Sequence, residues 1–174
     1  MSTTSKMMAR LLGLFWSRRQ AEMRQRWRRS LPFGDYVTDR WARAARYGFG
    51  EGTSVYDACL VLGDVSVGTN TWIGPFTVLD GSGGLDVGSD TTISAGVQIY
   101  THESLGRTVS QGESPISRAR TVVGSHCYLG PNVIVAMGIT IGDGAVVGAN
   151  SLVLGDIPPG KRAHGNPCVV VDPD

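Results

Sequence analysis

The sequence is poor in the residues that build disulfide frameworks and metal centres. Its 174 residues include three cysteines, an odd number, and no two of them form a CxxC pair. This usage argues against a disulfide framework or a structural zinc site and favours a reducing compartment. The three histidines, His102, His126 and His164, are separated by 24 and 38 positions, with no close pair on one strand or helix. We therefore predict no metal site.

Long apolar runs are also missing. Nothing in the chain approaches the roughly 20 consecutive apolar residues that a transmembrane helix needs. The apolar stretch at residues 11–16 is too short for the core of a signal peptide, and arginines rather than a cleavage site follow it. We expect a cytoplasmic protein, and peripheral contact with the inner membrane surface stays open as an option.

Acidic residues are scarce in the first part of the chain, and basic residues are scarce in the rest. Residues 1–46 hold 11 Lys and Arg against 3 Asp and Glu, whereas residues 47–174 hold 5 against 12. The formal net charge of +1 therefore conceals a basic arm on an acidic body. The acidic body argues against a nucleic-acid partner.

Residues 6–29 of the basic arm predict a helix with an apolar stripe. Met8, Leu12, Phe15, Met23 and Trp27 form the stripe, and many arginines surround it. One interpretation is a helix that docks on the rest of the molecule or on a neighbouring subunit. The other is a helix that lies at a membrane interface, because Arg on the polar face with Trp and Phe on the other is typical of such helices.

What the chain does have is an aliphatic residue that returns every six positions. This period fits neither a helix nor a simple alternating strand, but it fits a solenoid of short strands in which three hexads close one triangular coil. Gly, Ala or Ser follows most of these residues. They form three series: Val55, Val61, Val67, Ile73 and Leu79; Val87, Ile93 and Ile99; and Val123, Leu129, Val135, Ile141, Val147 and Val153.

Two further slots of each hexad carry their own chemistry. The residue two positions before the aliphatic one shares its strand face and is small or β-branched, as at Thr71 and Val97, which suits a narrow interior. The second and third residues after the aliphatic one form pairs such as Thr69-Asn70 and Asp143-Gly144. These residues tolerate positive φ or bond their own backbone, so they predict tight corners.

The patterns divide the chain into three parts. Residues 1–50 form the basic arm and a linker, residues 51–157 form the solenoid, and residues 158–174 form a C-terminal tail after the prolines that stop the last strand. The four residues 81–84 enlarge one corner by two positions. Residues 101–120, approximately, form a polar loop excluded from the coils, and loops of that length are usually functional.

His102, at the root of this excluded loop, is the candidate catalytic residue. It stands three positions after Ile99, in a corner slot that points away from the core. The unperturbed pKa of histidine, about 6.5, suits a general base at neutral pH. We interpret His126, which regular coils follow, and His164, in the tail, as surface residues.

At these residues the chain resembles the hexapeptide-repeat acyltransferases, and most closely the branch of galactoside, maltose, xenobiotic and polysaccharide-modifying O-acetyltransferases. The resemblance covers about residues 50–171. It is carried by the hexads, the loop histidine, Tyr-Leu-Gly-Pro-Asn at 128–132, Asp-Ile-Pro-Pro at 156–159 and Gly-Asn-Pro at 165–167. It implies an all-β fold, a left-handed parallel β-helix, that assembles as a homotrimer. It also implies acetyl-CoA as the acyl donor, no metal, and sites in the grooves between subunits.

By this resemblance His102 is the base that deprotonates an acceptor hydroxyl for attack on the thioester. The coenzyme is expected along the later coils and at a basic pair beyond them, near its nucleotide 3′-phosphate. We assign its binding to Gly130, Ala136, Gly148, Pro159, Lys161 and Arg162. The basic pair replaces a lysine that the family often has where this chain has Gly155. Pro131 lacks the N–H that the family's sugar acetyltransferases use at this place to stabilise the oxyanion, so that donor is not identified.

The acceptor is expected to be a sugar or glycan precursor, either a small molecule or a lipid-linked sugar, as in polysaccharide biosynthesis. Asp80, at the enlarged corner, has a carboxylate that can accept hydrogen bonds from sugar hydroxyls, and Glu103 and Arg107 of the excluded loop are assigned to the same site. Three alternatives stay open: an N-acyltransferase acting on an aminosugar, a zinc protein similar to γ-class carbonic anhydrases, and a trimeric interaction module without catalysis.

Overall fold

The chain divides into two compact units, Met1–Asp39 and Arg40–Asp174. The computed structural model describes residues 2–171, so the last residues of the predicted tail lie outside the described part. The division falls earlier than the predicted boundary after residue 50. The reason is α3 (Arg40–Arg46), which packs on the first coil: Arg43 donates to the Val55 carbonyl at 2.8 Å and forms an ion pair with Asp57 at 3.2 Å.

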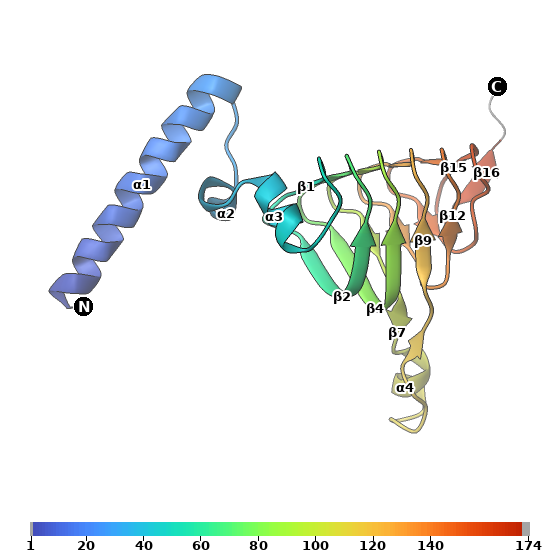
Figure 1. The fold of residues 1–174 in the computed structure, drawn as a ribbon. Helices are drawn as coiled ribbons and strands as arrows, with labels where there is room; N and C mark the ends of the chain where they lie inside the picture. The colour runs from blue at the N-terminus through green and yellow to red at the C-terminus, as the bar shows by residue number, and fades with distance from the viewer. Residues whose placement is uncertain (1, 172–174) are drawn as a thin grey trace. The chain divides into compact units, whose positions relative to one another are not determined.

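The second unit is a parallel β-helix with three faces (Figure 1). The strands of the first face are β1 (Ser54–Val55), β3 (Trp72–Ile73), β5 (Thr92–Ile93), β10 (Tyr128–Leu129), β13 (Val146–Val147) and β15 (Arg162–His164). The second face holds β6 (Gln98–Ile99), β11 (Ile134–Val135) and β14 (Leu152–Val153), and the third holds β9 (Thr121–Val123) and β12 (Thr140–Ile141). Strands β2 (Leu60–Val67) and β4 (Val78–Val87) turn a corner and belong to both.

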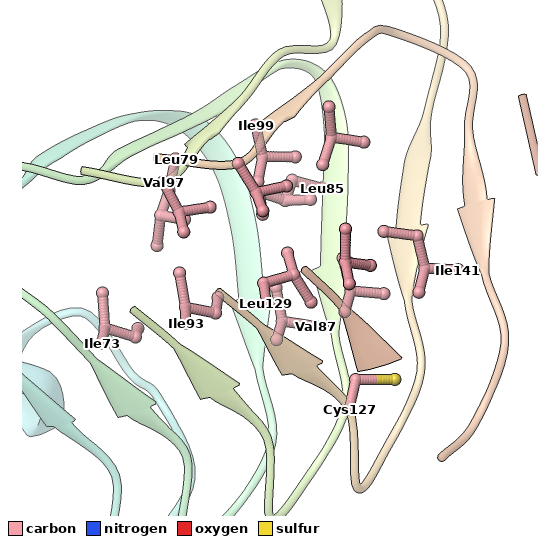
Figure 2. Close-up of a cluster of buried hydrophobic side chains, with 14 of the residues drawn as sticks. Ile73, Leu79, Leu85, Val87, Ile93, Val97, Ile99, Cys127, Leu129 and Ile141 are labelled. Carbon is pink, nitrogen blue, oxygen red and sulfur yellow. The ribbon is translucent and has the colours of Figure 1, made fainter. Parts of the chain in front are cut away.

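The aliphatic hexad residues form the core, as predicted. Thirteen of the fourteen are buried, and Val61 is partly buried against them. Figure 2 shows Ile73, Ile93 and Leu129 in a row, each contributed by the next coil of the first face. Because a side chain from each face meets the others inside the coil, one large residue per face fills the interior.

The slot two positions before each aliphatic residue links neighbouring coils. The Thr71 hydroxyl donates to the Gly88 carbonyl at 2.9 Å, and the Thr91 hydroxyl donates to the Gly124 carbonyl at 3.0 Å. The Cys127 thiol takes the same place one coil later, 3.2 Å from the Gly142 carbonyl. The polar atoms of these buried side chains are therefore satisfied inside the core.

The corners have the backbone that the turn residues predict. Asn70, Asp90 and His126 occupy one corner in successive coils, with φ of 53°, 54° and 59°. Asparagine and aspartate tolerate this left-handed conformation better than most residues. His126 therefore stands in a repeated corner position, with its side chain exposed.

The predicted tail continues the β-helix instead of leaving it. Strand β15 is the sixth parallel strand of the first face, one more than the five coils expected. Strand β16 (Val169–Val171) then pairs with β15 in the antiparallel direction. The prolines do stop a strand, since Ile157 forms only an isolated bridge with Ile141, but the chain resumes the coil beyond them.

The first unit is helical, as the apolar stripe predicts. Helix α1 (Thr3–Trp27) is followed by the short α2 (Phe33–Val37). The Trp16 ring packs edge-on against Phe33 with ring centroids 5.9 Å apart, and the Tyr36 hydroxyl accepts from the Leu31 amide at 2.9 Å. No helix among the described residues is long and apolar enough to cross a bilayer.

Candidate active site

The excluded loop leaves the β-helix beside the enlarged corner of β4. It contains β7 (His102–Glu103), α4 (Leu105–Val109) and β8 (Ser117–Arg118), and β7 pairs with β8 in the antiparallel direction. The loop's two ends are held together, because the Ala119 amide donates to the Thr101 carbonyl at 3.0 Å. This pairing holds His102 at the point where the loop meets the coil.

His102 pairs with Asp80, which sequence reasoning had placed in the acceptor site instead. The His102 Nδ1 lies 2.6 Å from Asp80 Oδ2. The side chain of Asp80 is 1% exposed, whereas that of His102 is 36% exposed. The carboxylate is therefore closed to solvent, and the imidazole is the part of the pair that a substrate can reach.

Both oxygens of Asp80 are already occupied. Oδ1 accepts from the Ser82 amide at 3.0 Å and from the Ser82 hydroxyl at 2.6 Å. Oδ2 accepts from the Thr101 amide at 3.0 Å in addition to His102. Burial alone would raise the pKa of Asp80, but these hydrogen bonds outweigh burial and hold its pKa well below the ordinary value. The expected contact between Asp80 and sugar hydroxyls is thus replaced by a positioning role.

The charge on Asp80 fixes the tautomer of His102. An ionised carboxylate can only accept hydrogen bonds, so Nδ1 of the imidazole carries the hydrogen that lies between them. Nε2 of the neutral ring then keeps its lone pair and can accept a proton. The pair has the arrangement of a general base held in one orientation by a buried acid.

The enlarged corner makes room for this arrangement. A Cβ on Gly83 would collide with the Thr101 carbonyl oxygen and would lie 3.0 Å from the Ala119 nitrogen. The Gly83 amide donates to the Thr101 hydroxyl at 2.8 Å, and that hydroxyl donates to the Asp80 carbonyl, also at 2.8 Å. The glycines of the corner thus allow the loop to approach β4 closely enough for Asp80 to reach His102.

Sequence reasoning missed Ser82, Thr101 and the pairing itself. The signal was present in the hexads: Asp80 stands one position after Leu79 and His102 three positions after Ile99, and these two aliphatic residues are neighbours on adjacent coils. Residues one to three positions after register-paired ones lie at the same corner of the coil, so the two side chains could be expected near each other.

The other residues assigned from the sequence lie at several corners of the coil. Ala136 follows β11 on the corner column that also holds Asp80 and His102. Gly130 and Gly148 stack at the next corner, where Gly130 donates to the Val147 carbonyl. Pro159 and the basic pair lie at the third corner and on the first face. Within one chain, therefore, only Ala136 shares a corner with His102.

The two loop residues assigned to the acceptor differ in position. Glu103 is exposed and adjoins His102 in β7, so it stays a candidate for acceptor contact. Arg107 lies in α4, at the outer end of the excluded loop (Figure 1). Among the described residues, no three His, Cys, Asp or Glu side chains converge in the manner of a metal site.

Comparison with known proteins shows which family the chain resembles. Residues 120–155 match the family model described as bacterial transferase hexapeptide, six repeats. Over these residues the chain is similar to hexapeptide-repeat transferases. WcaF of Escherichia coli (strain K12), which bears the name of a colanic acid biosynthesis acetyltransferase, is 34% identical over 109 residues. That alignment covers 62% of this chain but only 57% of WcaF. The predicted kinship with the hexapeptide-repeat acyltransferases is confirmed.

Solved structures with a similar fold confirm the predicted β-helix. A maltose O-acetyltransferase from Clostridium difficile 630 superposes with a TM-score of 0.60 at 24% identity, over 92% of this chain and 87% of that one. AntD is an N-acyltransferase from Bacillus cereus solved with dTDP and 3-hydroxybutyryl-CoA. It gives a TM-score of 0.64 at 22% identity, over 71% of this chain and 70% of AntD. At these identities the likeness establishes the fold.

Proposed function

We propose that the chain is an O-acetyltransferase that moves an acetyl group from acetyl-CoA to a hydroxyl of a sugar or glycan precursor. The observation that carries the proposal is the pair of His102 and Asp80, with Nδ1 bound to a buried carboxylate and the imidazole 36% exposed. The acetyltransferase names of WcaF and of the maltose enzyme support the reaction class. The name of WcaF also supports a polysaccharide precursor as the acceptor.

The residues of the later coils fit a coenzyme that carries phosphates and a long flexible arm. Lys161 and the exposed Arg162 are cations suited to a phosphate group. Gly130, Ala136, Gly148 and Pro159 have small or compact side chains, so an extended arm can lie close to the backbone. The bound coenzyme supplies a thioester carbonyl as the electrophile.

His102 performs the proton transfers in this proposal. Nε2 takes the proton of the acceptor hydroxyl as its oxygen forms a bond to the thioester carbon. Asp80 stabilises the imidazolium that forms and keeps the ring in its orientation. When the carbon–sulfur bond breaks, His102 returns the proton to the departing sulfur, so the base is regenerated and the products are an ester and a free thiol.

The same pair favours a hydroxyl over an amine as the acceptor. An alcohol is a weak nucleophile until a base removes its proton, whereas a neutral amine attacks without that help. A histidine held in one tautomer by a buried carboxylate supplies the base that an alcohol needs. We therefore rank O-acylation above N-acylation of an aminosugar.

Replacing His102 tests the proposal. His102→Ala should lower kcat about 10²- to 10⁴-fold, the range of general-base catalysis, while coenzyme affinity by calorimetry stays nearly unchanged. Asp80→Asn should also lower kcat, because an amide no longer fixes the tautomer. The assay is thiol release from acetyl-CoA with sugars, nucleotide sugars and lipid-linked glycans, followed by identification of the acylated atom.

His126→Asn is the matched control, because asparagine already occupies the equivalent corner at Asn70 and this change removes an exposed imidazole without strain. It should keep nearly the full rate. A His102→Ala protein that retains more than about a tenth of the rate contradicts the mechanism, since general-base loss is larger. An acylated nitrogen as the sole product replaces the O-transfer assignment with N-transfer, and a protein without coenzyme binding contradicts both.

A further inference from the structure

Helix α1 exposes large apolar side chains that the proposed reaction does not use. None of its residues is buried. The apolar side chains gather in the first half of the helix, each 42–62% exposed: Met7, Met8, Leu11, Leu12, Leu14, Phe15 and Trp16. Seven such side chains in ten residues form an exposed apolar surface of the kind that marks a binding site for a protein or a membrane.

The first half of α1 is amphipathic. At about 100° per residue, Met8, Leu12 and Phe15 lie on one side of the helix, whereas Lys6 and Arg10 lie on the opposite side. Apolar and cationic side chains are thus separated around the helix axis, which is typical of helices that lie at a membrane interface.

In the second half of α1, arginines lie along the apolar stripe beside Met23 and Trp27. Seven residues make almost two turns, so Arg19 and Arg26 follow Leu12 along the same side of the helix. Arg18 follows Leu11 in the same way. Glu22 forms ion pairs with two of these arginines, at 3.4 Å from Arg18 and 2.8 Å from Arg19. The same side of α1 is therefore apolar at its start, whereas arginines flank its apolar residues at its end.

We propose that α1 binds the surface of an anionic lipid bilayer, with its first half inserted among the acyl chains and its arginines over the phosphates. A second copy of α1 fits less well. Parallel helices packed along this side would bring Arg19 and Arg26 against their own copies, and antiparallel helices would bury arginines against leucines. A bilayer offers apolar and anionic layers within a few ångströms, so both halves of the helix are satisfied at once.

Vesicle binding by the full chain tests this inference. Flotation with phosphatidylglycerol–phosphatidylethanolamine vesicles should recover the protein, and pure phosphatidylcholine vesicles should recover much less. Arg18→Gln/Arg26→Gln should weaken partitioning to the anionic vesicles about 20- to 30-fold, because each arginine near the surface contributes about fivefold. High salt should weaken wild-type binding in the same way.

Leu11→Gln/Phe15→Gln removes apolar surface at constant charge and should weaken binding at least about tenfold. Arg46→Gln and Val109→Gln are the matched controls, because each removes an exposed side chain of the same kind outside α1, and both should bind like wild type.

Equal binding by the two α1 variants and the controls overturns the inference. So does an α1 variant that changes only the subunit number, because self-association then occupies the stripe. Neither outcome depends on acyl transfer, so the proposed function is tested separately.

Discussion

Asp80 is a charged side chain enclosed by its own chain, and its neighbours account for this. A buried carboxylate is costly unless hydrogen bonds replace its hydration. Ser82, Thr101 and His102 supply those hydrogen bonds from both sides of the enlarged corner. Of the three, only His102 has a ring nitrogen that can accept a proton, and its side chain is 36% exposed, so the hydrogen bonds connect a buried negative charge to a base that solvent reaches. One residue thus serves both the stability of the corner and the orientation of the base.

The lowered pKa of Asp80 predicts how stability depends on pH. Because the folded state depresses this pKa below the ordinary carboxyl value of about 3.9, the carboxylate stabilises the fold fully above that pH. The contribution is lost as pH falls below about 4 toward the lower value of the folded state. Asp80→Asn should therefore be less stable than wild type at pH 7, and the difference should shrink at pH 3. Urea unfolding at a fixed protein concentration measures both. A difference that is the same at the two pH values contradicts the assignment of this charge.

At the scale of elements, the enlarged corner of β4 and the excluded loop form one functional part. The loop leaves the coil at Thr101, and its return at Ala119 is bonded to the same residue. The corner of residues 81–84 touches both ends, because Gly83 contacts Thr101 and Ala119. Two departures from the hexad pattern, separated by about a coil in sequence, are thus adjacent in space and depend on each other.

Gly83→Ala tests this dependence. The added Cβ collides with backbone atoms, which cannot move aside as a flexible side chain can, so the corner and the loop must shift. We expect a loss of about 1–3 kcal/mol in the free energy of unfolding, as for other overpacked sites, together with a lower kcat because Asp80 and Thr101 move. Thermal or urea unfolding and the thiol-release assay measure the two effects.

Gly155→Ala is the control, because a Cβ there has no atom within 4 Å and the residue lies two coils beyond the one that carries His102. It should unfold and react like wild type. If Gly83→Ala does the same, the close approach of loop and corner is not required.

The hexads were sufficient to predict most elements of the β-helix. Buried positions, strand faces and corners each depend on local chemistry repeated in phase, so Ile93 and Asn70 could be placed from their neighbours alone. The last coil was missed because Pro158 and Pro159 break the strand without ending the coil, and only the pairing of β15 with β13 shows that it continues. The role of Asp80 was missed because it depends on a contact between two coils rather than on the residues beside it.

At the scale of the whole molecule, the positions of the residues assigned to coenzyme binding predict that subunits must assemble to form the site. Lys161, Arg162 and Pro159 do not share a corner with His102 within one chain. We therefore propose a homotrimer in which the histidine of one chain meets the basic pair of the next, as a closed ring of head-to-tail contacts allows. The proposed reaction therefore requires an assembled protein rather than a single chain.

Mixed trimers test this arrangement. His102→Ala and Lys161→Ala/Arg162→Ala each damage every site of their own trimer. In trimers formed from equal amounts of the two, about a quarter of the sites combine an intact histidine with an intact basic pair from a neighbour. Co-expression of the two variants should therefore restore up to about a quarter of the wild-type rate. The two proteins mixed after separate assembly are the control and should stay inactive.

Mass measurement of the co-expressed sample must show mixed trimers for the test to be read. Mixed trimers without recovered activity contradict a site shared between subunits, because then both groups act within one chain. A monomer by light scattering at micromolar concentration contradicts the assembly itself.

The meeting of the two ends of the excluded loop has a consequence for how such proteins diversify. A segment whose ends nearly touch can be lengthened, shortened or exchanged without altering the coils on either side, because closing a longer loop adds little entropy cost. An exchange that begins after His102 leaves this residue in place, because Asp80 of the preceding coil holds its side chain. Descendants of one ancestor can thus keep the same proton transfer and acquire new acceptors by replacing a single cassette, so that chemistry and selectivity are inherited as separate traits.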